Sequence, residues 1–193
     1  MSIAGLILAA GESRRMGSPK ALLEYRGATF LDTLIGLLAE RCSPVIVALG
    51  AGAEEIRART SRPARFVVNP DWARGQITSM QCGLRAVPPE ADGVLFTLVD
   101  HPAVSMNTID ALLAPGQGAT LLRVPRFEGR RGHPIWFARE LIDEFLALPE
   151  TGAARDVVRL HAGRTAFLDL DDPGIVTDID DPAAYRTLAG AIR

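Results

Sequence analysis

Residues 8–20 read Leu-Ala-Ala-Gly-Glu-Ser-Arg-Arg-Met-Gly-Ser-Pro-Lys and continue directly from an apolar run at residues 3–8. The run has the length of one buried strand, so the quoted stretch is expected to form the loop at its carboxyl end. In open α/β sheets, ligands bind at that end of the strands. Ala9, Ala10 and Gly11 have almost no side chains, so a ligand could approach their backbone N–H groups closely.

Three cations, Arg14, Arg15 and Lys20, lie in the same stretch. Backbone donors and positive side chains in one short loop predict a site for a polyphosphate. We expect Arg15 and Lys20 to hold the phosphates and Arg14 to face solvent. An ordinary polar loop between a strand and a helix is the simpler interpretation, and these residues alone leave it open.

Two better-known phosphate-binding loops are excluded. A P-loop has four residues between its glycines and a lysine after the second, whereas five residues separate Gly11 from Gly17 and Ser18 follows. A dinucleotide fingerprint has three glycines in the pattern G-x-G-x-x-G. The glycine-rich run at residues 50–52 has Glu55 in the third position.

The chain has 193 residues, of which 48% are hydrophobic and 23% charged, and its formal net charge is -2. This length fits a single domain, residues 1–193, with a sizeable core. A nearly neutral chain has no global basic field for nucleic acid. No apolar run reaches the roughly 18 residues of a membrane span, and the first residues lack the basic region of a signal peptide. We therefore expect a cytoplasmic protein, with Cys42 and Cys82 as inert thiols.

Apolar strand-like runs alternate with helical patterns along the chain. Strands are predicted at residues 3–8, 44–49, 65–68, 93–99, 119–124, 134–137 and 165–170. Helices are predicted at residues 29–40, 53–60, 79–86, 139–148, 153–161 and 182–191, with another that Ser105 caps and that runs to residue 113. Residues 126–132 are predicted as a charged turn. This alternation favours an α/β fold with a mostly parallel sheet between helices.

Acidic residues follow two of the predicted strands. Asp100 comes directly after the strand at residues 93–99 and would point into the same crevice as the first loop. Carboxylates together with substrate phosphates are the usual ligands of Mg²⁺, although Asp100 could instead cap the next helix. Asp178 and Asp180 would share one face of an extended segment, so one of them could be a second ligand. Capping of the closing helix is the alternative, especially for Asp181.

The first loop fits the signature L-A-A-G-x-S-x-R-M-G-x-P-K at thirteen consecutive positions. With it the chain resembles the MobA-like nucleotidyltransferases, and within them the molybdenum cofactor cytidylyltransferases most closely. The resemblance implies a Rossmann-like nucleotidyltransferase fold, three-layered α/β/α, with some late strands in a mixed sheet. It also implies that the run from Leu8 to Gly11, together with Arg15 and Lys20, binds the nucleotide. Guanylyl-transferring relatives usually have glycine at the position of Ala10, so alanine there favours CTP.

The segment from Asn69 to Leu84 resembles the N-P-x-W-x-x-G…S-M/L-x-x-G-L segment of the same family. The match implies nucleotide contacts from Gly75, Ser79 and Gly83. A helix start flanked by glycine, with Ser79 as its N-cap, is the simpler interpretation.

Two further motifs resemble family motifs near the metal and the acceptor. Asp100 matches the aspartate of a D-x-P motif that binds the metal, with His101 where glutamine or methionine is common. Asp178 and Asp180 match a D-x-D-T-P motif, with Asp181 in place of threonine.

The Gly-His-Pro run at residues 132–134 matches a motif near the acceptor, so His101 and His133 are expected on the acceptor side. A solvated charged turn is the other interpretation of this run. Residues 150–155 lack the Gly-Asp start of the family's G-D-x-G-A-R motif, so the chain departs from the family pattern there.

Together these features predict a Mg²⁺-dependent nucleotidyltransferase that moves CMP from CTP to the phosphate of molybdopterin and releases pyrophosphate. Lys20, Arg15 and Asp100 are its expected catalytic residues. A molybdoenzyme or its chaperone is a possible partner, and neither nucleic acid nor membrane is expected. Three alternatives remain: guanylyl transfer to molybdopterin, cytidylyl transfer to methylerythritol phosphate, and a non-catalytic nucleotide-binding partner of a molybdoenzyme.

Overall fold

The computed structural model describes residues 2–115 and 119–190. Its strands are β1 Ile3–Ala9, β2 Glu24–Tyr25, β3 Ala28–Thr29, β4 Val45–Leu49, β5 Arg65–Val68, β6 Gly93–Leu98, β7 Leu122–Phe127, β8 Arg130–Arg131, β9 Ile135–Ala138 and β10 Thr165–Asp169. Its α-helices are α1 Phe30–Ala39, α2 Ala53–Arg59, α3 Gln76–Leu84, α4 Met106–Leu113, α5 Ile142–Ala147, α6 Ala154–Leu160 and α7 Pro182–Gly190. The predicted end of the closing helix, residue 191, lies outside the described residues.

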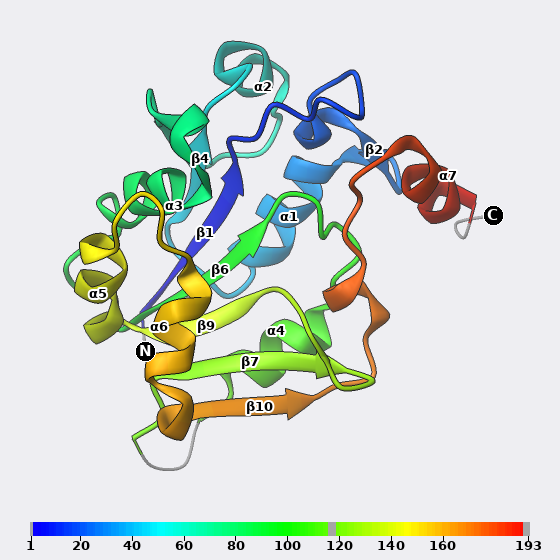
Figure 1. The fold of residues 1–193 in the computed structure, drawn as a ribbon. Coiled ribbons are helices and arrows are strands. Elements are labelled where there is room, and N and C mark those ends of the chain that lie inside the picture. Colours follow the sequence, from blue (N-terminus) through cyan, green and yellow to red (C-terminus); the bar gives the residue numbers. More distant parts are fainter. Residues whose placement is uncertain (1, 116–118, 191–193) are drawn as a thin grey trace.

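The main sheet has the order β10-β7-β9-β6-β1-β4-β5, with β8 paired to β7 (Figure 1). Strands β5, β4, β1 and β6 run parallel to one another. Strand β9 is antiparallel to both β6 and β7, while β10 is parallel to β7. The α/β class and the mixed, mostly parallel sheet are therefore confirmed. Within the described residues, no helix has the length and apolar character needed to cross a membrane.

Helices cover both faces of the sheet because its strands are apolar on both sides. Ile3 and Ile7 of β1 belong to one hydrophobic cluster, and Leu6 and Leu8 belong to another, as the alternation along a strand requires. Helices α1 and α4 pack on the first face, and α3, α5 and α6 pack on the second (Figure 1). The result is the predicted three-layer arrangement.

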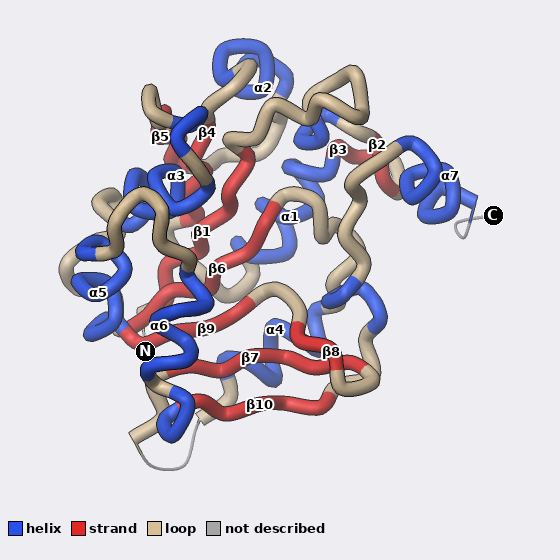
Figure 2. Tube along the Cα trace, viewed as in Figure 1, coloured by secondary structure: helices blue, strands red, loops and turns tan. Residues whose placement is uncertain are grey.

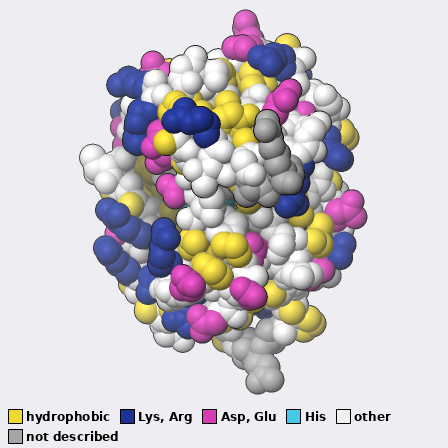
Figure 3. Space-filling model, turned by 90° about the vertical axis from the view of Figure 1, so that its right-hand side faces the viewer, with side chains coloured by type: hydrophobic (Ala, Val, Ile, Leu, Met, Phe, Trp, Pro, Cys, Tyr) yellow, Lys and Arg dark blue, Asp and Glu magenta, His cyan; other side chains and the backbone are white. Residues whose placement is uncertain are grey.

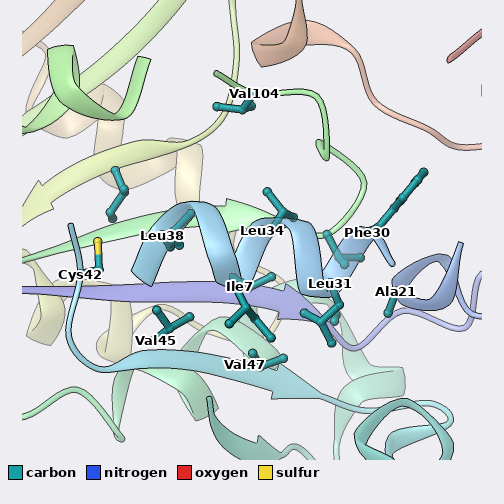
Figure 4. Packing of buried hydrophobic residues seen from close by; sticks show 14 of the residues in the cluster. Ile7, Ala21, Phe30, Leu31, Leu34, Leu38, Cys42, Val45, Val47 and Val104 are labelled. Atoms are coloured by element: carbon teal, nitrogen blue, oxygen red, sulfur yellow. The ribbon is translucent and has the colours of Figure 1, made fainter. Parts of the chain in front are cut away.

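Helix α1 shows how one apolar stripe fixes a layer. Leu31, Leu34 and Leu38, spaced three and four residues apart, are at most 1% exposed. They belong to one hydrophobic cluster with Ile7 of β1 and Val47 of β4, and Figure 4 shows Leu31 on the side of the helix toward Val47. The stripe therefore holds α1 across the two central strands, beneath the loop that follows β1.

Two tight hairpins differ from the sequence prediction. The charged turn predicted at residues 126–132 is wrong in part, because its ends pair as β7 and β8. Glu128 and Gly129 have φ angles of 49° and 76°, as a two-residue hairpin turn requires. Arg26 and Gly27, with φ of 51° and 83°, form a similar turn between β2 and β3, which the sequence reading missed. Figure 2 shows this second hairpin apart from the main sheet, near α7.

Helix α3 begins at Gln76, three residues earlier than predicted. The interpretation of Ser79 as an N-cap is therefore wrong. Gly75 is the N-cap residue, and the Thr78 hydroxyl donates to its carbonyl at 2.8 Å. Ser79 is 3% exposed inside the helix.

Residues 170–181, here called the C-terminal strap, connect β10 to α7 beside the carboxyl ends of the central strands (Figure 1). Three backbone hydrogen bonds fasten the strap. Leu170 donates to the Arg126 carbonyl at 2.8 Å, Ile179 donates to the Asp100 carbonyl at 3.0 Å, and His133 donates to the Ile175 carbonyl at 2.9 Å. Ile175 and Ile179 are 0% and 1% exposed. The strap is thus an ordered part of the core.

The buried carboxylate of Asp172 fixes the beginning of the strap. It accepts hydrogen bonds from the Ser105 N–H at 2.9 Å, the Ser105 hydroxyl at 2.8 Å and the Thr108 hydroxyl at 2.6 Å. Because Ser105 caps α4, Asp172 ties the strap to the loop between Asp100 and that helix. The strap and the loop that follows Asp100 are therefore held together.

Gly132 offers a direct test of strap packing. A Cβ atom at residue 132 would lie 2.0 Å from the Ile175 carbonyl oxygen. We expect Gly132→Ala to lower the free energy of unfolding by about 1–3 kcal/mol, the usual cost of overpacking. Urea unfolding would measure it, with Gly163→Ala as the control, because a Cβ there meets nothing within 4 Å. Equal stability of the two variants would contradict this packing.

Candidate active site

The order of the strands brings the first loop and Asp100 together. Strand β1 lies between β4 and β6 and is parallel to both, so the loops that follow these strands leave the same edge of the sheet. The Val99 N–H donates to the Leu8 carbonyl at 3.0 Å, and the Ala51 N–H donates to the Ala10 carbonyl at 3.1 Å. The small-residue loop is therefore fastened on both sides, with Asp100 next to it.

A cavity of about 430 Å³ opens at this edge, within the size range of small-molecule sites. Its walls come from the first loop, the ends of β1 and β6, the start of α3 and the strap. The lining residues are Leu8, Ala9, Ala10, Gly11, Ser13, Arg14, Arg15, Pro19, Lys20, Ala21, Ile56, Trp72, Gln76, Ser79, Leu98, Val99, Asp100 and Asp180. We call it the first cavity.

The first loop folds back on itself so that Lys20 returns to the cavity. Ser13 has a φ of 54°, and its hydroxyl accepts a hydrogen bond from the Lys20 N–H at 3.0 Å. The Met16 N–H donates to the Ser13 carbonyl at 2.9 Å. Lys20 then begins a short 3₁₀ helix, Lys20–Leu22, whose Ala21 and Leu22 are buried. The lysine side chain is thus attached to the core at its base.

The ammonium of Lys20 lies between two carboxylates. Its Nζ is 3.2 Å from Asp100 Oδ2 and also donates to Asp180 Oδ1. The side chains of Lys20, Asp100 and Asp180 are 14%, 19% and 44% exposed. Burial lowers the pKa of Lys20, but the hydrogen bonds and charges of the two carboxylates outweigh burial and leave that pKa raised. The hydrogen bond from Lys20 lowers the pKa of Asp180.

The carboxylates suit a hard divalent cation. Asp100 Oδ1 is buried and has no hydrogen-bond partner among the described residues, so it retains lone pairs for a ligand. Asp180 contributes a second carboxylate at the same place. Across residues 2–115 and 119–190, no group of three or more His, Cys, Asp or Glu side chains is arranged to hold a metal. Two carboxylates with phosphate oxygens from a substrate form the usual Mg²⁺ environment.

The other predicted residues divide clearly by position. Arg14 and Arg15 both line the first cavity, but the Arg14 side chain is 83% exposed and pairs with Glu12. Asp178 is exposed and lies outside the lining of the first cavity, and Asp181 accepts hydrogen bonds from the first backbone N–H groups of α7. The capping interpretation is confirmed for Asp181.

The predicted residues of the segment around α3 also separate. Ser79 lines the first cavity, whereas Gly75 lines a second one. Gly83 lines neither and packs against β1, where an added Cβ would lie 2.4 Å from the Leu6 side chain. Gly83 thus lets α3 approach β1 closely.

The second cavity has a volume of about 440 Å³ and lies on the other side of α3's first turn. Its lining is mostly apolar, with Arg131, Arg155, Glu150 and His133 among the polar residues. The rings of His101 and His133 are 5.2 Å apart. His101 Nε2 is 3.7 Å from Asp100 Oδ1, so the two histidines connect the carboxylate region to the second cavity.

Some lining residues had no signal in the sequence reading. Trp72 lines the first cavity and packs against Gly50, where an added Cβ would lie 2.5 Å from the Trp72 Cβ. Gln76 also lines it. The tryptophan of the N-P-x-W motif could have indicated the first, but Gln76 lies in the unspecified gap between the glycine and the serine of that pattern. Figure 3 shows basic, acidic and hydrophobic side chains mixed over the right-hand side of Figure 1, so any anion site there is local.

Residues 5–166 match the family model described as the MobA-like NTP transferase domain. The chain belongs to this MobA-like family. The match covers the first loop, Asp100 and the second cavity, and ends before the strap.

Several relatives of this MobA-like chain have named activities. It is 39% identical to nicotine blue oxidoreductase of Paenarthrobacter nicotinovorans, over 96% of each chain. It is 27% identical to molybdenum cofactor cytidylyltransferase of Escherichia coli K12, over 94% of this chain and 93% of that one. It is 32% identical to a probable molybdenum cofactor guanylyltransferase of Mycobacterium avium strain 104, over 99% and 97%. The family relationship is clear, while the named activities differ.

A solved structure confirms the fold over the full length. The protein Rv0371c of Mycobacterium tuberculosis H37Rv, in a complex with manganese, has a TM-score of 0.80 and 30% identity, covering 99% of this chain and all of that one.

His133 gives the site a testable pH dependence. Burial lowers its pKa to about 3, whereas in the unfolded chain the ring titrates near 6.5. Below pH 6.5 unfolding therefore takes up a proton, and acid lowers the free energy of unfolding by about 1.4 kcal/mol per pH unit. Between pH 7 and pH 5, we expect the free energy of unfolding of the wild type to fall by about 2 kcal/mol more than that of His133→Gln. Urea unfolding at the two pH values would measure both. The same loss in both proteins would contradict a buried neutral ring.

Proposed function

We propose that this MobA-like protein transfers CMP from CTP to the phosphate of molybdopterin and releases pyrophosphate. The observation that supports it most is the Lys20 ammonium between Asp100 and Asp180, inside a cavity walled by a loop of very small residues. Two carboxylates and a lysine beside free backbone donors are suited to a metal-bound triphosphate. A molybdoenzyme or its chaperone would receive the product.

The proposed reaction requires no general base. A phosphate monoester is already anionic at neutral pH, so its oxygen can attack the α-phosphorus while pyrophosphate leaves. The chain then has to position the two anions and offset their charge. Lys20 and Arg15 supply positive charge to the phosphates, and backbone N–H groups of the first loop add donors.

Asp100 and Asp180 would hold Mg²⁺, which would neutralise charge on the triphosphate when bound. The manganese complex of the related Rv0371c protein supports a divalent cation in this fold. Between the two candidate strap residues, the structure favours Asp180, because it lines the first cavity and Asp178 does not. His101 and His133 would lie on the acceptor side, as their place beside the second cavity suggests.

Guanylyl transfer to molybdopterin, cytidylyl transfer to methylerythritol phosphate and a non-catalytic nucleotide-binding role remain the alternatives within this fold. A second class of function has its own support. The 39% identity to nicotine blue oxidoreductase, together with the mostly apolar second cavity, favours a reductase acting on a compound such as nicotine blue. The two classes separate by product: an oxidoreductase changes the oxidation state of its substrate and releases no pyrophosphate.

The transferase proposal is tested by pyrophosphate release with CTP, Mg²⁺ and molybdopterin, using wild type and Asp100→Asn. The amide has the shape of the carboxylate but no charge, so we expect at least a roughly 10²-fold loss of turnover. Asp143→Asn, an exposed change on α5, is the matched control. If Asp100→Asn keeps the turnover of the wild type, the Asp100 carboxylate has no role in the reaction. Turnover of nicotine blue in a parallel assay, without pyrophosphate release from CTP, would favour the reductase.

Ala10 is the residue that we expect to favour cytosine over guanine as the base of the nucleotide. Its backbone is fixed by the hydrogen bond from Ala51, so its methyl group cannot retreat from the cavity. One methyl in a packed pocket contributes about 1–3 kcal/mol of discrimination, so we expect CTP to exceed GTP in kcat/KM by roughly tenfold or more. Ala10→Gly should narrow that ratio without lowering the melting temperature by more than a few degrees. An equal or higher kcat/KM for GTP in wild type would contradict the cytidylyl assignment.

A further inference from the structure

The first and second cavities adjoin at the beginning of α3. Among the described residues, Gln76 and Leu98 line both of them. If the nucleotide occupies the first cavity and the acceptor the second, the bond that forms must form at this junction. The residues at the junction therefore decide how the two substrates meet.

Only one of the two junction residues is polar. Leu98, at the end of β6, offers the substrates an apolar side chain. Gln76 is exposed and offers a carboxamide, which donates through its nitrogen and accepts through its oxygen. Because the carboxamide carries no charge, it neither repels phosphate groups nor holds them as an ion pair would.

The backbone beneath Gln76 is fixed in place by buried hydrogen bonds. The Asn69 side-chain amide donates to Thr78 Oγ1 and to Ser79 Oγ, both at 2.9 Å. The Thr78 hydroxyl donates to the Gly75 carbonyl, the residue just before Gln76. These three polar side chains are at most 8% exposed. The first turn of α3 is thus held in one conformation. A residue that positions a substrate needs such a fixed backbone beneath it.

The same helix is also attached to the segment that leads to Glu150, a residue of the second cavity. The Gln81 side-chain amide donates to the carbonyls of Phe145, Leu146 and Leu148 at 2.9–3.2 Å. Arg74 Nη2 lies 2.7 Å from Glu150 Oε2, which lines that cavity. Gln76 therefore has a fixed position relative to both cavities.

We propose that Gln76 aligns the acceptor phosphate with the donor nucleotide by hydrogen bonding at the junction of the two cavities. This inference rests on the proposed transferase function. The side chain would donate its N–H to a phosphate oxygen and so hold the attacking oxygen in line. It is a positioning role that adds to those of Lys20 and Asp100.

Gln76→Ala and Gln76→Glu test the inference in the pyrophosphate-release assay with CTP, Mg²⁺ and molybdopterin. For Gln76→Ala we expect kcat to fall by roughly 10–100-fold, the scale of a misplaced reacting group. KM for CTP and the rise in melting temperature with CTP should change little. Gln76→Glu has the same shape but loses the N–H donor and adds negative charge, so its kcat should fall at least as far.

Gln76→Glu separates positioning from a structural role. A glutamate in the first turn of a helix is favoured by the helix dipole, so a merely structural role predicts a stable and active Gln76→Glu protein. That result, or a change in KM alone, would overturn the inference and leave the transferase proposal standing. Absence of pyrophosphate release from wild type with all four triphosphates would overturn both.

Discussion

The pairing of one ammonium with two carboxylates is the interaction that the rest of the site depends on. Lys20 meets residues 80 and 160 positions away in the chain. Two carboxylates this close repel one another in a partly buried setting, and a cation between them removes that repulsion. The site therefore needs positive charge there at all times. Lys20 supplies it in this structure, and a divalent cation bound by the carboxylates would add to it in the proposed complex.

Two features of the fold make this pairing possible. The parallel order β6-β1-β4 places Asp100 beside the loop that carries Lys20, because neighbouring strands end at one edge. The C-terminal strap then brings Asp180 to that edge from the opposite end of the chain. Asp172 and the hydrogen bond from Ile179 to Asp100 hold the strap in place. Fold stability and site geometry thus share the same contacts.

The features that could be predicted from the sequence are those that depend on local residue patterns. The apolar run before Leu8 and the acid after β6 could be placed at one edge, because carboxyl ends of parallel strands coincide. The choice between Asp178 and Asp180 could not be made, since it depends on how the strap bends around the buried Ile179. Gln76 also carried no signal, because its importance comes from two cavities that meet only in three dimensions.

The division into two cavities explains why one scaffold can accompany different named activities among its relatives. The first cavity is built from the small-residue loop and the ion pairs of Lys20 with Asp100 and Asp180. The second is bounded by mostly apolar side chains and by residues 150–155, where this chain departs from the family motif. Apolar walls tolerate substitution more readily than a set of paired charges, because volume can be exchanged without leaving a buried charge unpaired. Substrate differences should therefore accumulate in the second cavity, and they would meet the proposed donor site at the junction beside Gln76.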